Sequence, residues 1–417
     1  MTGAAPADDG RPLSGGVDRD HPARISLPGG RTGGLGGRLR VVPEDFRVEE
    51  IPLRRARGTG PYTLVQIEKR RTSTFDALLF VSKAAKVSER VIGYAGLKDA
   101  RAVTTQYLTV PRVPPERLLG VATDRWRVLS AERHDQPLKI GHLLGNRFAI
   151  RIRDVDGAAF GRASEVLERI VAEGLPNAYG RQRFGARQDG HRVGRALLHG
   201  DLPRMLAHLL GRPSPLEFDD QVRAARAAFD RGDLAEAAGR MPMRQRLEKR
   251  ALAHLARGGT PEAWIEDLGR GRRRIWLAAW QAYLFNRVLD RRLGDGTWNR
   301  LQDGDVAWVA DEGVLVTARP GHGQPGGRLA PTGPLPGTSL RPAQGAVGAL
   351  EAAVLEAEGE DEALWGRPHI RSRGLRRPLA VPVREASLER DGPRDVLVRF
   401  VLPSGSFATV LLDLLMA

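Results

Sequence analysis

Residues 91 to 110 contain the side chains best suited to chemistry. The segment reads VIGYAGLKDARAVTTQYLTV, and its small residues, among them Gly93 and Gly96, are followed directly by Lys98 and Asp99. Glycines let a backbone bend sharply and approach a ligand closely, so this spacing predicts a lysine–aspartate pair at a strand end beside a cleft. An aspartate next to a lysine is also common as a surface ion pair that contributes little to stability. The residue types alone leave both interpretations of Asp99 open.

Lysine is a rare choice in this chain, which makes Lys98 informative. Of the 65 lysine and arginine residues only six are lysines, at positions 69, 83, 86, 98, 139 and 249. A lysine at 98 therefore favours a specific demand there. The same bias weakens the meaning of the net charge of +15. An excess of basic residues favours binding to nucleic acid or to an anionic membrane surface, but arginine-rich coding also produces it.

The composition is that of a soluble globular protein. Hydrophobic residues make up 41% of the chain and charged residues 28%, and 417 residues favour two domains over one. No apolar run approaches the roughly 18 to 20 residues that a membrane span needs, and the N-terminus lacks the apolar core of a secretory signal. Cysteine is absent, which excludes disulfides, thiolate metal sites and a cysteine nucleophile. We therefore expect a cytoplasmic enzyme with no membrane partner.

The first part of the chain predicts a tail followed by a sheet. Residues 1–38 are rich in glycine, proline and charge and end in LPGGRTGGLGGR, which predicts a disordered tail. From residue 39 to about 152, β-branched and aromatic runs separated by turn residues predict strands, namely FRVEEI, YTLVQIEK, YLTVPRV, RWRVLSA and RFAIRIR. A helix is predicted from Thr74 to Lys86, with one side formed by Phe75, Leu78, Leu79 and Ser82.

The character of the chain changes after about residue 174. Leucine- and alanine-rich helical patterns dominate residues 196–257 and 272–292. The second helix is predicted to have an inward stripe spaced three or four residues apart, Leu277, Trp280, Leu284 and Val288. Its tryptophans are interpreted as helix core in preference to base-stacking surfaces. Residues 318–348 are rich in proline and glycine and predict a mobile loop. The final stretch, DVLVRFVLPSGSFATVLLDLL, predicts a strand, a turn and then an apolar helix or strand.

The segment around Asp99 resembles the signature of TruD-type pseudouridine synthases, in which Gly-x-Lys-Asp is followed by Ala-Val-Thr-x-Gln. Here it reads GLKDARAVTTQ, from Gly96 to Gln106. Four further segments resemble family elements in the expected order, so the resemblance spans residues 43–409. They are Pro43-Glu44-Asp45-Phe46 with Val48 and Glu49 (PEDFxVxE), Gly145-Asn146-Arg147-Phe148 (GNxF), NAYGRQRFG at 177–185 (NYFGxQRFG) and LPSGSFAT at 402–409 (LPAGSFAT).

Three positions depart from the family pattern. Ala178 stands where an aromatic residue is usual, Tyr179 stands where phenylalanine is favoured, and Arg40 replaces the common lysine before PEDF. The resemblance implies an enzyme that isomerises uridine to pseudouridine in RNA through one aspartate, here Asp99, with no metal and no cofactor. A nearby cation would hold that carboxylate in place, and Arg40 is the candidate, with Lys98 as the alternative. The resemblance also implies substrate contacts at Phe46, Asn146 and Phe407.

The resemblance implies an α/β (α+β) fold in two domains. A pseudouridine-synthase catalytic domain, with a mainly antiparallel sheet, would be assembled from residues 39–173 and 377–417. Residues 174–376 between these segments would form a helix-rich inserted TRUD domain. The implied substrate is transfer RNA, modified at uridine 13, and no obligate protein partner is implied. Arginines that we expect to contact RNA phosphates stand at 181, 183, 187, 192 and 195.

Two other functions fit part of the same sequence. One is a catalytically silent RNA-binding or RNA-folding protein, which would need neither Lys98-Asp99 nor the two candidate stacking phenylalanines. The other is a ribosyl hydrolase, which would share the carboxylate but release free uracil. Whether Asp99 acts as nucleophile or base stays open, because a carboxylate near C1′ or C2′ of a ribose can do either.

Overall fold

The computed structural model describes residues 32–217, 219–309, 314–318, 329–367 and 370–417, together with Ala23, Ile25 and Gly30. Beyond residue 30 the chain forms two compact units. We call Arg31–Leu175 with Val381–Ala417 the sheet unit, and Pro176–Ala380 the helical unit. The short strands β7 (Leu175–Pro176) and β12 (Ala380–Val381) contain the two points where the chain passes between units. The domain boundaries expected at 173/174 and 376/377 stay a prediction.

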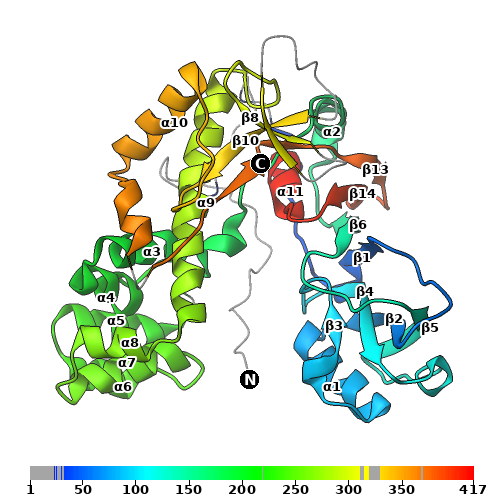
Figure 1. Cartoon of the computed structure of the whole chain (residues 1–417), viewed down its shortest axis with the longest axis horizontal. Coiled ribbons are helices and arrows are strands. Elements are labelled where there is room, and N and C mark those ends of the chain that lie inside the picture. The colour runs from blue at the N-terminus through cyan, green and yellow to red at the C-terminus, as the bar shows by residue number, and fades with distance from the viewer. Residues whose placement is uncertain are drawn as a thin grey trace. The chain divides into compact units, whose positions relative to one another are not determined.

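The sheet unit is built on one large, mainly antiparallel sheet, which confirms the predicted fold class (Figure 1). Within the described ranges its order is β13-β14-β6-β1-β4-β2-β5, with β3 paired to β4. Only the pair β1·β4 is parallel among the pairs described. The strands are β1 (Phe46–Pro52), β2 (Tyr62–Arg70), β3 (Gly93–Tyr94), β4 (Val103–Pro111), β5 (Trp126–His134), β6 (Leu143–Ile152), β13 (Arg384–Arg390) and β14 (Val396–Pro403). Each predicted strand run lies in one of them.

One face of this sheet is buried and the other carries charge, as expected of an antiparallel sheet with one solvated face. The register pairs Val48 with both Phe148 and Thr104, and Thr104 with Lys69, so these side chains share a face. All four side chains are buried, because this face of the sheet is the one turned toward the interior. On the opposite face Glu49 lies beside Arg147, and both are exposed enough to meet water. The alternation along each strand therefore decides which polar residues enter the interior.

Three helices complete the sheet unit: α1 (Thr74–Ala85), α2 (Phe160–Glu173) and α11 (Ala408–Met416). Helix α1 confirms the predicted helix, and Ser73 caps it by accepting a hydrogen bond from the Asp76 amide. Its predicted face is only half right, because Phe75 and Leu79 are exposed. The buried face packs against β2, β4 and β5 and consists of Thr74, Ala77, Leu78, Val81, Ser82 and Ala85. Short 3-10 turns in this unit are Pro43–Asp45, Glu89–Val91, Pro115–Arg117 and Gly157–Ala159.

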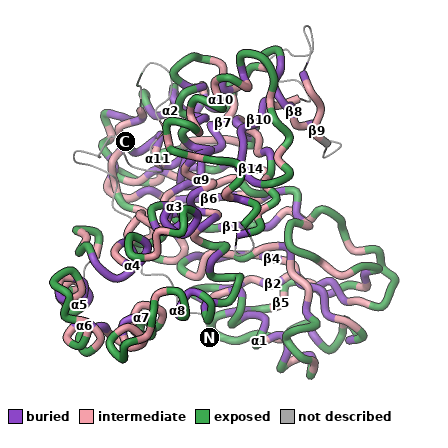
Figure 2. The backbone as a smooth tube through the Cα atoms, turned by 60° about the vertical axis from the view of Figure 1, so that its left-hand side comes forward, coloured by how far each residue is buried: buried purple, intermediate pink, exposed green. Residues whose placement is uncertain are grey.

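The helical unit packs its helices around α9 (Arg270–Gly294), whose predicted stripe of Leu277, Trp280, Leu284 and Val288 is confirmed as buried (Figure 2). The other helices are α3 (Gly190–His199), α4 (Leu202–Leu210), α5 (Asp220–Asp230), α6 (Leu234–Arg240), α7 (Arg246–Ala256), α8 (Pro261–Asp267) and α10 (Gly345–Ala357), with 3-10 turns at Arg181–Phe184 and Glu362–Gly366. A smaller sheet, ordered β11-β10-β8-β9, joins them; its strands are β8 (Val306–Val309), β9 (Val314–Thr317), β10 (Leu329–Leu335) and β11 (Leu375–Pro378).

The prediction of a mobile loop at residues 318–348 is wrong for the part of this segment that the structure describes. That part contains β10, which pairs with β8 and β11, and the start of α10. Residues 319–328 lie outside the described residues. Across the described ranges no helix combines the length and apolar character needed to cross a bilayer.

The prediction of a disordered tail over residues 1–38 extends too far along the chain, because residues 33–36 are ordered. Leu35 is fully buried, and the backbone amides of residues 33–36 donate to the carbonyls of residues 414–417 at 2.7 to 3.1 Å. The last carbonyls of a helix have no partner within the helix, so this segment satisfies the C-terminal end of α11. Glycine is needed here because a Cβ on Gly33 would lie 2.2 Å from the Leu415 carbonyl oxygen. Apart from Ala23, Ile25 and Gly30, residues 1–31 lie outside the described residues.

Replacing Gly33 by alanine should therefore destabilise the sheet unit. The added methyl group meets backbone, which cannot rotate away, and overpacking of this kind costs about 1–3 kcal/mol. Thermal unfolding followed by circular dichroism measures the effect. The control is Gly161→Ala in α2, where a Cβ would meet nothing within 4 Å and the substitution should be neutral or stabilising by up to about 1 kcal/mol. Equal melting temperatures for Gly33→Ala and wild type would contradict the packing described above.

Candidate active site

The loop between β3 and β4 presents Asp99 with both carboxylate oxygens engaged. Arg40 Nη2 donates to Asp99 Oδ2 at 2.6 Å, and the Arg101 amide donates to Oδ1 at 2.8 Å. The Asp99 side chain is 26% exposed, whereas that of Arg40 is 8% exposed. The carboxylate is thus fixed in orientation from one side and open to an incoming molecule from another. The expected ion pair between Arg40 and Asp99 is present.

Two features of the backbone hold Arg40 in position. Arg38 forms an isolated β-bridge with Arg153, with hydrogen bonds of 2.7 and 2.9 Å in both directions. Arg40 itself has φ 56°, a left-handed conformation that turns the chain toward Asp99. Its guanidinium carbon lies 4.2 Å from the centroid of the Phe46 ring, a cation–π contact. Arg40 is therefore clamped between an aromatic face and a carboxylate.

Phe46, a predicted substrate contact, lies mostly in the interior. Its side chain is 4% exposed and its ring packs edge-on to Phe148, with centroids 6.5 Å apart. Together with the contact from Arg40, this leaves the ring engaged on two sides. Its contact with substrate stays a prediction, and the interaction that the structure gives it is support of Arg40.

Lys98, the alternative partner of Asp99, instead pairs with a glutamate beneath the loop. Its Nζ lies 2.6 Å from Glu50 Oε2, and the side chains are 5% and 1% exposed. Burial raises the pKa of Glu50, and the ion pair with Lys98 opposes that rise. The Lys98 amide also donates to Thr74 Oγ1 at the start of α1. Lys98 thus anchors the loop from below while its neighbour Asp99 faces outward.

Glu50 is a residue that the motif itself could have revealed. Counted from Pro43, the element PEDFxVxE ends at Glu50, one position after the Glu49 singled out from the sequence. Glu49 lies on the charged face of the sheet and pairs with Arg147 at 2.9 Å. Since successive side chains of a strand point to opposite faces, the one-residue difference separates a surface residue from a buried one.

Lys69 is not among the predicted site residues, yet it lies under the same loop. Its side chain is buried, and Nζ donates to the Thr72 carbonyl at 2.6 Å and to the Asp99 carbonyl at 3.1 Å. Burial lowers the pKa of Lys69 to about 8, with Asp99 acting in the opposite direction. The scarcity of lysine, which drew attention to Lys98, was the available signal for Lys69 as well. Both lysines place positive charge behind Asp99.

The remaining predicted contacts, Asn146 and Phe407, lie on adjoining strands and their extensions. Asn146 in β6 is the register partner of Glu50 on one side and of Leu402 in β14 on the other. Its Oδ1 is buried and lacks a hydrogen-bond partner within the part of the chain that the structure describes. Buried acceptors are nearly always satisfied, so this atom is suited to a donor on a ligand. Phe407 follows β14 and is the half-buried N-cap residue of α11.

Metal-ligating side chains are not clustered among the described residues. No group of three or more histidine and acidic side chains lies close enough together within the described ranges. What the cluster offers is one oriented carboxylate, three basic side chains around its loop and an amide acceptor. Such a set can stabilise or attack a carbon that develops positive charge, and can bind a base edge through hydrogen bonds.

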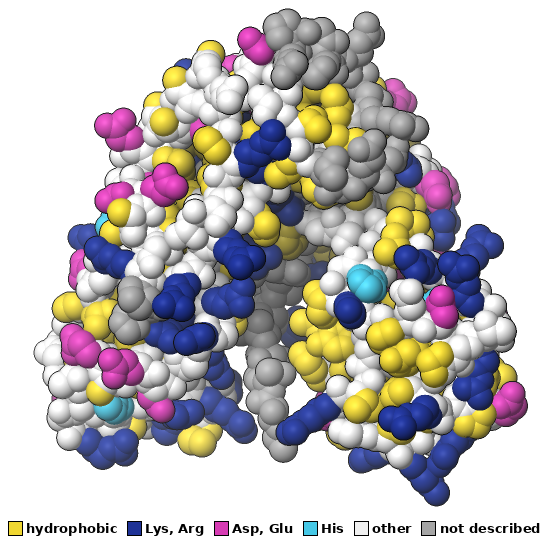
Figure 3. Space-filling view, viewed as in Figure 1, with side chains coloured by type: hydrophobic (Ala, Val, Ile, Leu, Met, Phe, Trp, Pro, Cys, Tyr) yellow, Lys and Arg dark blue, Asp and Glu magenta, His cyan; other side chains and the backbone are white. Residues whose placement is uncertain are grey.

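The segment NAYGRQRFG lies in the helical unit and packs there. Ala178 and Tyr179 are buried, the Tyr179 amide donates to Asn286 Oδ1, and the Arg377 guanidinium lies 4.2 Å from the Tyr179 ring centroid. Of the arginines expected to contact phosphate, Arg187 is paired with Asp189 at 2.6 Å. Figure 3 shows lysine and arginine side chains spread over the surface in this view.

Known proteins resemble this chain over most of its length. A family model described as tRNA pseudouridine synthase D (TruD) matches residues 29–413. Relatives named tRNA pseudouridine synthase D from Geobacter metallireducens and Geobacter sulfurreducens are each 39% identical over 387 residues, covering 91% of this chain and 94% and 93% of theirs. A crystal structure of the putative tRNA pseudouridine synthase D from Methanosarcina mazei matches with a TM-score of 0.79 and 29% identity, covering 94% of this chain and 96% of that one.

A mainly antiparallel sheet that presents one aspartate, together with these matches, defines a pseudouridine synthase, an isomerase. The chain belongs to the TruD family of tRNA pseudouridine synthases. The resemblance given by the five sequence motifs is thereby confirmed, as is the predicted enzyme class.

The buried pair of Glu50 and Lys98 predicts a strong asymmetry between two adjacent glutamates. Glu50→Gln should cost about 3–5 kcal/mol of unfolding free energy, because Lys98 is left buried without its countercharge. Glu49→Gln, the control, removes only an exposed ion pair and should cost less than about 1 kcal/mol. Urea unfolding measures both. Combining Glu50→Leu with Lys98→Met should recover most of the lost unfolding free energy. If Glu50→Gln lowers the unfolding free energy no more than Glu49→Gln does, the buried-pair assignment is wrong.

The lowered pKa of Lys69 predicts a pH dependence of stability. Between a folded-state pKa of about 8 and the ordinary value of 10.5, the folded protein binds fewer protons than the unfolded chain. The contribution of Lys69 to stability therefore rises with pH through this window, by at most about 1.4 kcal/mol per pH unit. Urea unfolding of wild type and Lys69→Met, near pH 7.5 and near pH 9.5, should show wild type gaining relative to the variant. An identical pH response of the two proteins would show that Lys69 does not titrate in this range.

Proposed function

We propose that this protein isomerises uridine to pseudouridine in transfer RNA, at position 13, and that Asp99 is its catalytic carboxylate. The observation that carries the proposal is the pair of Arg40 and Asp99, in which a partly exposed carboxylate is fixed by a nearly buried guanidinium. The family to which the chain belongs is described as acting on tRNA, which supports the substrate class. We place the activity in the cytoplasm, where a transfer RNA substrate is found.

The reaction breaks the bond between N1 of the base and C1′ of the ribose, turns the base and rejoins it through C5. The hydrogen at C5 leaves as a proton once the new bond forms, and N1, freed from C1′, takes up a proton, so atoms balance without a cofactor. Asp99 faces the reacting ribose, where it adds to or supports C1′, or removes a proton at C2′. Arg40 holds the carboxylate oxygen, and Lys69 and Lys98 hold its loop.

The target base must leave its helical stack before it can react, and it must stay bound after detachment. Asn146 supplies a hydrogen-bonding amide whose buried Oδ1 is suited to a donor on the uracil edge. Phe407, half-buried at the start of α11, is the side chain that we propose as the stacking face for the base, an interaction of about 1–3 kcal/mol. Phe46 acts chiefly through Arg40, whose guanidinium lies over its ring.

Asp99→Asn tests the proposal because it keeps the size of the side chain and removes its charge. Tritium release from C5-tritiated uridine in tRNA, measured in single turnover, should fall below detection, while tRNA affinity stays within a few-fold because phosphate contacts supply most of it. Asp99→Glu should lose roughly a hundredfold, since one methylene displaces the carboxylate by about an ångström.

Asp76→Asn is the matched control, because Asp76 is an exposed carboxylate in the same unit, at the start of α1. It should retain tritium release close to that of wild type. Full tritium release by Asp99→Asn would sink the catalytic assignment. Release of free uracil by wild type would instead identify a ribosyl hydrolase, and tight tRNA binding by wild type without any pseudouridine would identify a catalytically silent RNA-binding protein.

A further inference from the structure

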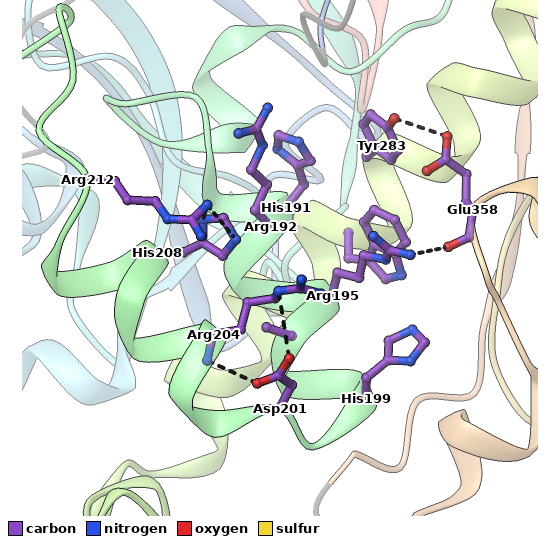
Figure 4. A pocket seen from close by; sticks show the side chains of 12 residues that line it. His191, Arg192, Arg195, His199, Asp201, Arg204, His208, Arg212, Tyr283 and Glu358 are labelled. Carbon is purple, nitrogen blue, oxygen red and sulfur yellow. Dashed lines mark hydrogen bonds and ion pairs between the residues drawn. The ribbon is translucent and has the colours of Figure 1, made fainter. Parts of the chain in front are cut away.

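The helical unit contains a cavity with strongly basic walls, lined by Arg192 and Arg195, two of the arginines expected to contact phosphate, and by further basic residues that the sequence did not single out. Its volume is about 560 Å³, and helices α3, α4 and α9 line it (Figure 4). The basic side chains that line it are Arg192, Arg195, Arg204, Arg212, His191, His199 and His208. Only Asp201 and Glu358 bring negative charge to the lining residues. Even with all three histidines neutral, positive charge is in excess.

The basic residues form two stripes at helical spacing. On α3 they stand at 192, 195 and 199, and along α4 and just beyond its end they stand at 204, 208 and 212. Residues three or four apart share one face of a helix, so each stripe points the same way. Figure 4 shows labelled side chains from both helices around the same cavity. Like charges at this spacing destabilise a helix by a few tenths of a kcal/mol per pair, so the arrangement is not one that folding favours.

Two of these arginines have no carboxylate partner within the described ranges. Arg212 Nη1 lies 3.3 Å from His208 Nδ1, and no acid meets the side chain of Arg192 or that of Arg212 among the described residues. Arg204 lies 3.7 Å from Asp201 and remains 62% exposed. Elsewhere in the same unit, buried arginines are matched to acids: Arg226 to Glu217, Arg292 to Asp305 and Arg376 to Glu351.

Burial and the positive charges around the cavity lower the pKa of one histidine, His208. Burial and then Arg212, Arg192, Arg187 and Arg204 lower the pKa of His208 to about 4. His208 is therefore neutral at neutral pH, and the charges around it oppose a further cation. An anion placed among the same groups experiences the opposite effect and is stabilised.

The backbone of Arg212 has a strained conformation. Its φ is 54°, in the left-handed region that glycine occupies freely and other residues enter at about 1–3 kcal/mol. Its amide donates to Asp230 Oδ2 at 2.8 Å, which fixes the turn. A glycine would make the same turn without strain. The presence of arginine therefore points to a use for its side chain, which returns over His208 toward the cavity.

The chemistry of the walls selects a phosphate group over a base. Guanidinium forks match phosphate oxygens with two parallel hydrogen bonds. The aromatic rings nearby are already stacked on one another: His191 on Tyr283 with centroids 4.8 Å apart, and Tyr283 on Trp280 at 5.1 Å. Tyr283 is thereby engaged in two stacked pairs within the protein, which leaves it less available to a base. Binding at this cavity would be independent of nucleotide sequence.

We propose that this cavity binds a backbone phosphodiester of the substrate RNA, with Arg192, Arg204 and Arg212 as its ligands. The proposal rests on the RNA-modifying function proposed above and adds a second point of attachment, in the helical unit. Phosphate contacts of this kind fix register and orientation of an RNA without reading its sequence. The cavity positions the substrate, and Asp99 acts on it.

The test is the salt dependence of tRNA binding by Arg192→Gln combined with Arg212→Gln. Loss of two phosphate contacts should reduce the log–log slope of affinity against salt by about 1.4 to 1.8 and weaken binding about tenfold or more near 0.1 M salt. The control combines Arg250→Gln with Arg291→Gln, which removes the same charge from exposed ion pairs of the same unit. Its slope should match that of wild type.

Three outcomes overturn the proposal. The first is an unchanged slope in the cavity variant, and the second is an equal change in the control, which would show an effect of net charge alone. The third is tight binding of inorganic phosphate, measured by calorimetry, that the cavity variant loses while its tRNA slope stays intact; the site would then serve a small phosphorylated molecule. Should the double variant fail to fold, Arg192→Gln alone, at an exposed position, should reduce the slope by about 0.7 to 0.9.

Failure of the proposed function gives a different pattern. The binding titration does not depend on chemistry, so absence of pseudouridine in the wild-type reaction would contradict the enzymatic proposal and leave the slope interpretable. Normal pseudouridine formation with an unchanged slope would contradict only the cavity. The two proposals are therefore tested by separate measurements on the same proteins.

Discussion

The ion pair between Arg40 and Asp99 is the contact on which the rest of the site depends. It joins side chains 59 residues apart at 2.6 Å, so neither local segment can form it alone. Arg40 reaches its place because residues 33–36 bind the end of α11 and Arg38 bridges to Arg153. Asp99 reaches its place because Lys69 and Lys98 hold its loop over the sheet. Residues 33–40, helix α11 and the central sheet thus all help to position one carboxylate.

Burying the charges beneath the loop costs free energy. That cost explains why each charged group has a close, well-aligned partner. Lys69, Lys98 and Glu50 are all nearly inaccessible to water, where a charge requires close, well-aligned partners. An apolar set of similar volume would often give equal or greater stability. What the charged set adds is a fixed backbone: Lys69 donates to the carbonyls of Thr72 and Asp99, and Lys98 reaches a glutamate below the loop. A catalytic carboxylate gains from such fixation because small displacements reduce rate strongly.

The two units differ in the kind of interaction they offer an RNA. The sheet unit gathers groups that act on one nucleotide: a carboxylate, an amide and an aromatic ring. The helical unit offers a cavity lined by guanidinium groups, two of which have no acidic partner among the described residues, and its aromatic rings are stacked on one another. Recognition of a base and attachment of a backbone are separate tasks in RNA binding, and they are served here by separate sets of residues.

The sequence by itself determined what depends on local pattern. Alternation predicted the strands, the stripe on α9 predicted Leu277 and Trp280 as core, and five ordered motifs indicated the family and Asp99. For Asp99 the sequence offered Arg40, with Lys98 as the alternative, and the tertiary structure decided between them; it alone paired Lys98 with Glu50 and placed Lys69 beneath the loop. It also turned a glycine-rich tail into the partner of α11 and brought the stripes of α3 and α4 together around one cavity. The reason is that such pairings depend on strand register and on contacts between distant segments, whereas periodicity records only which face of its own element a residue occupies.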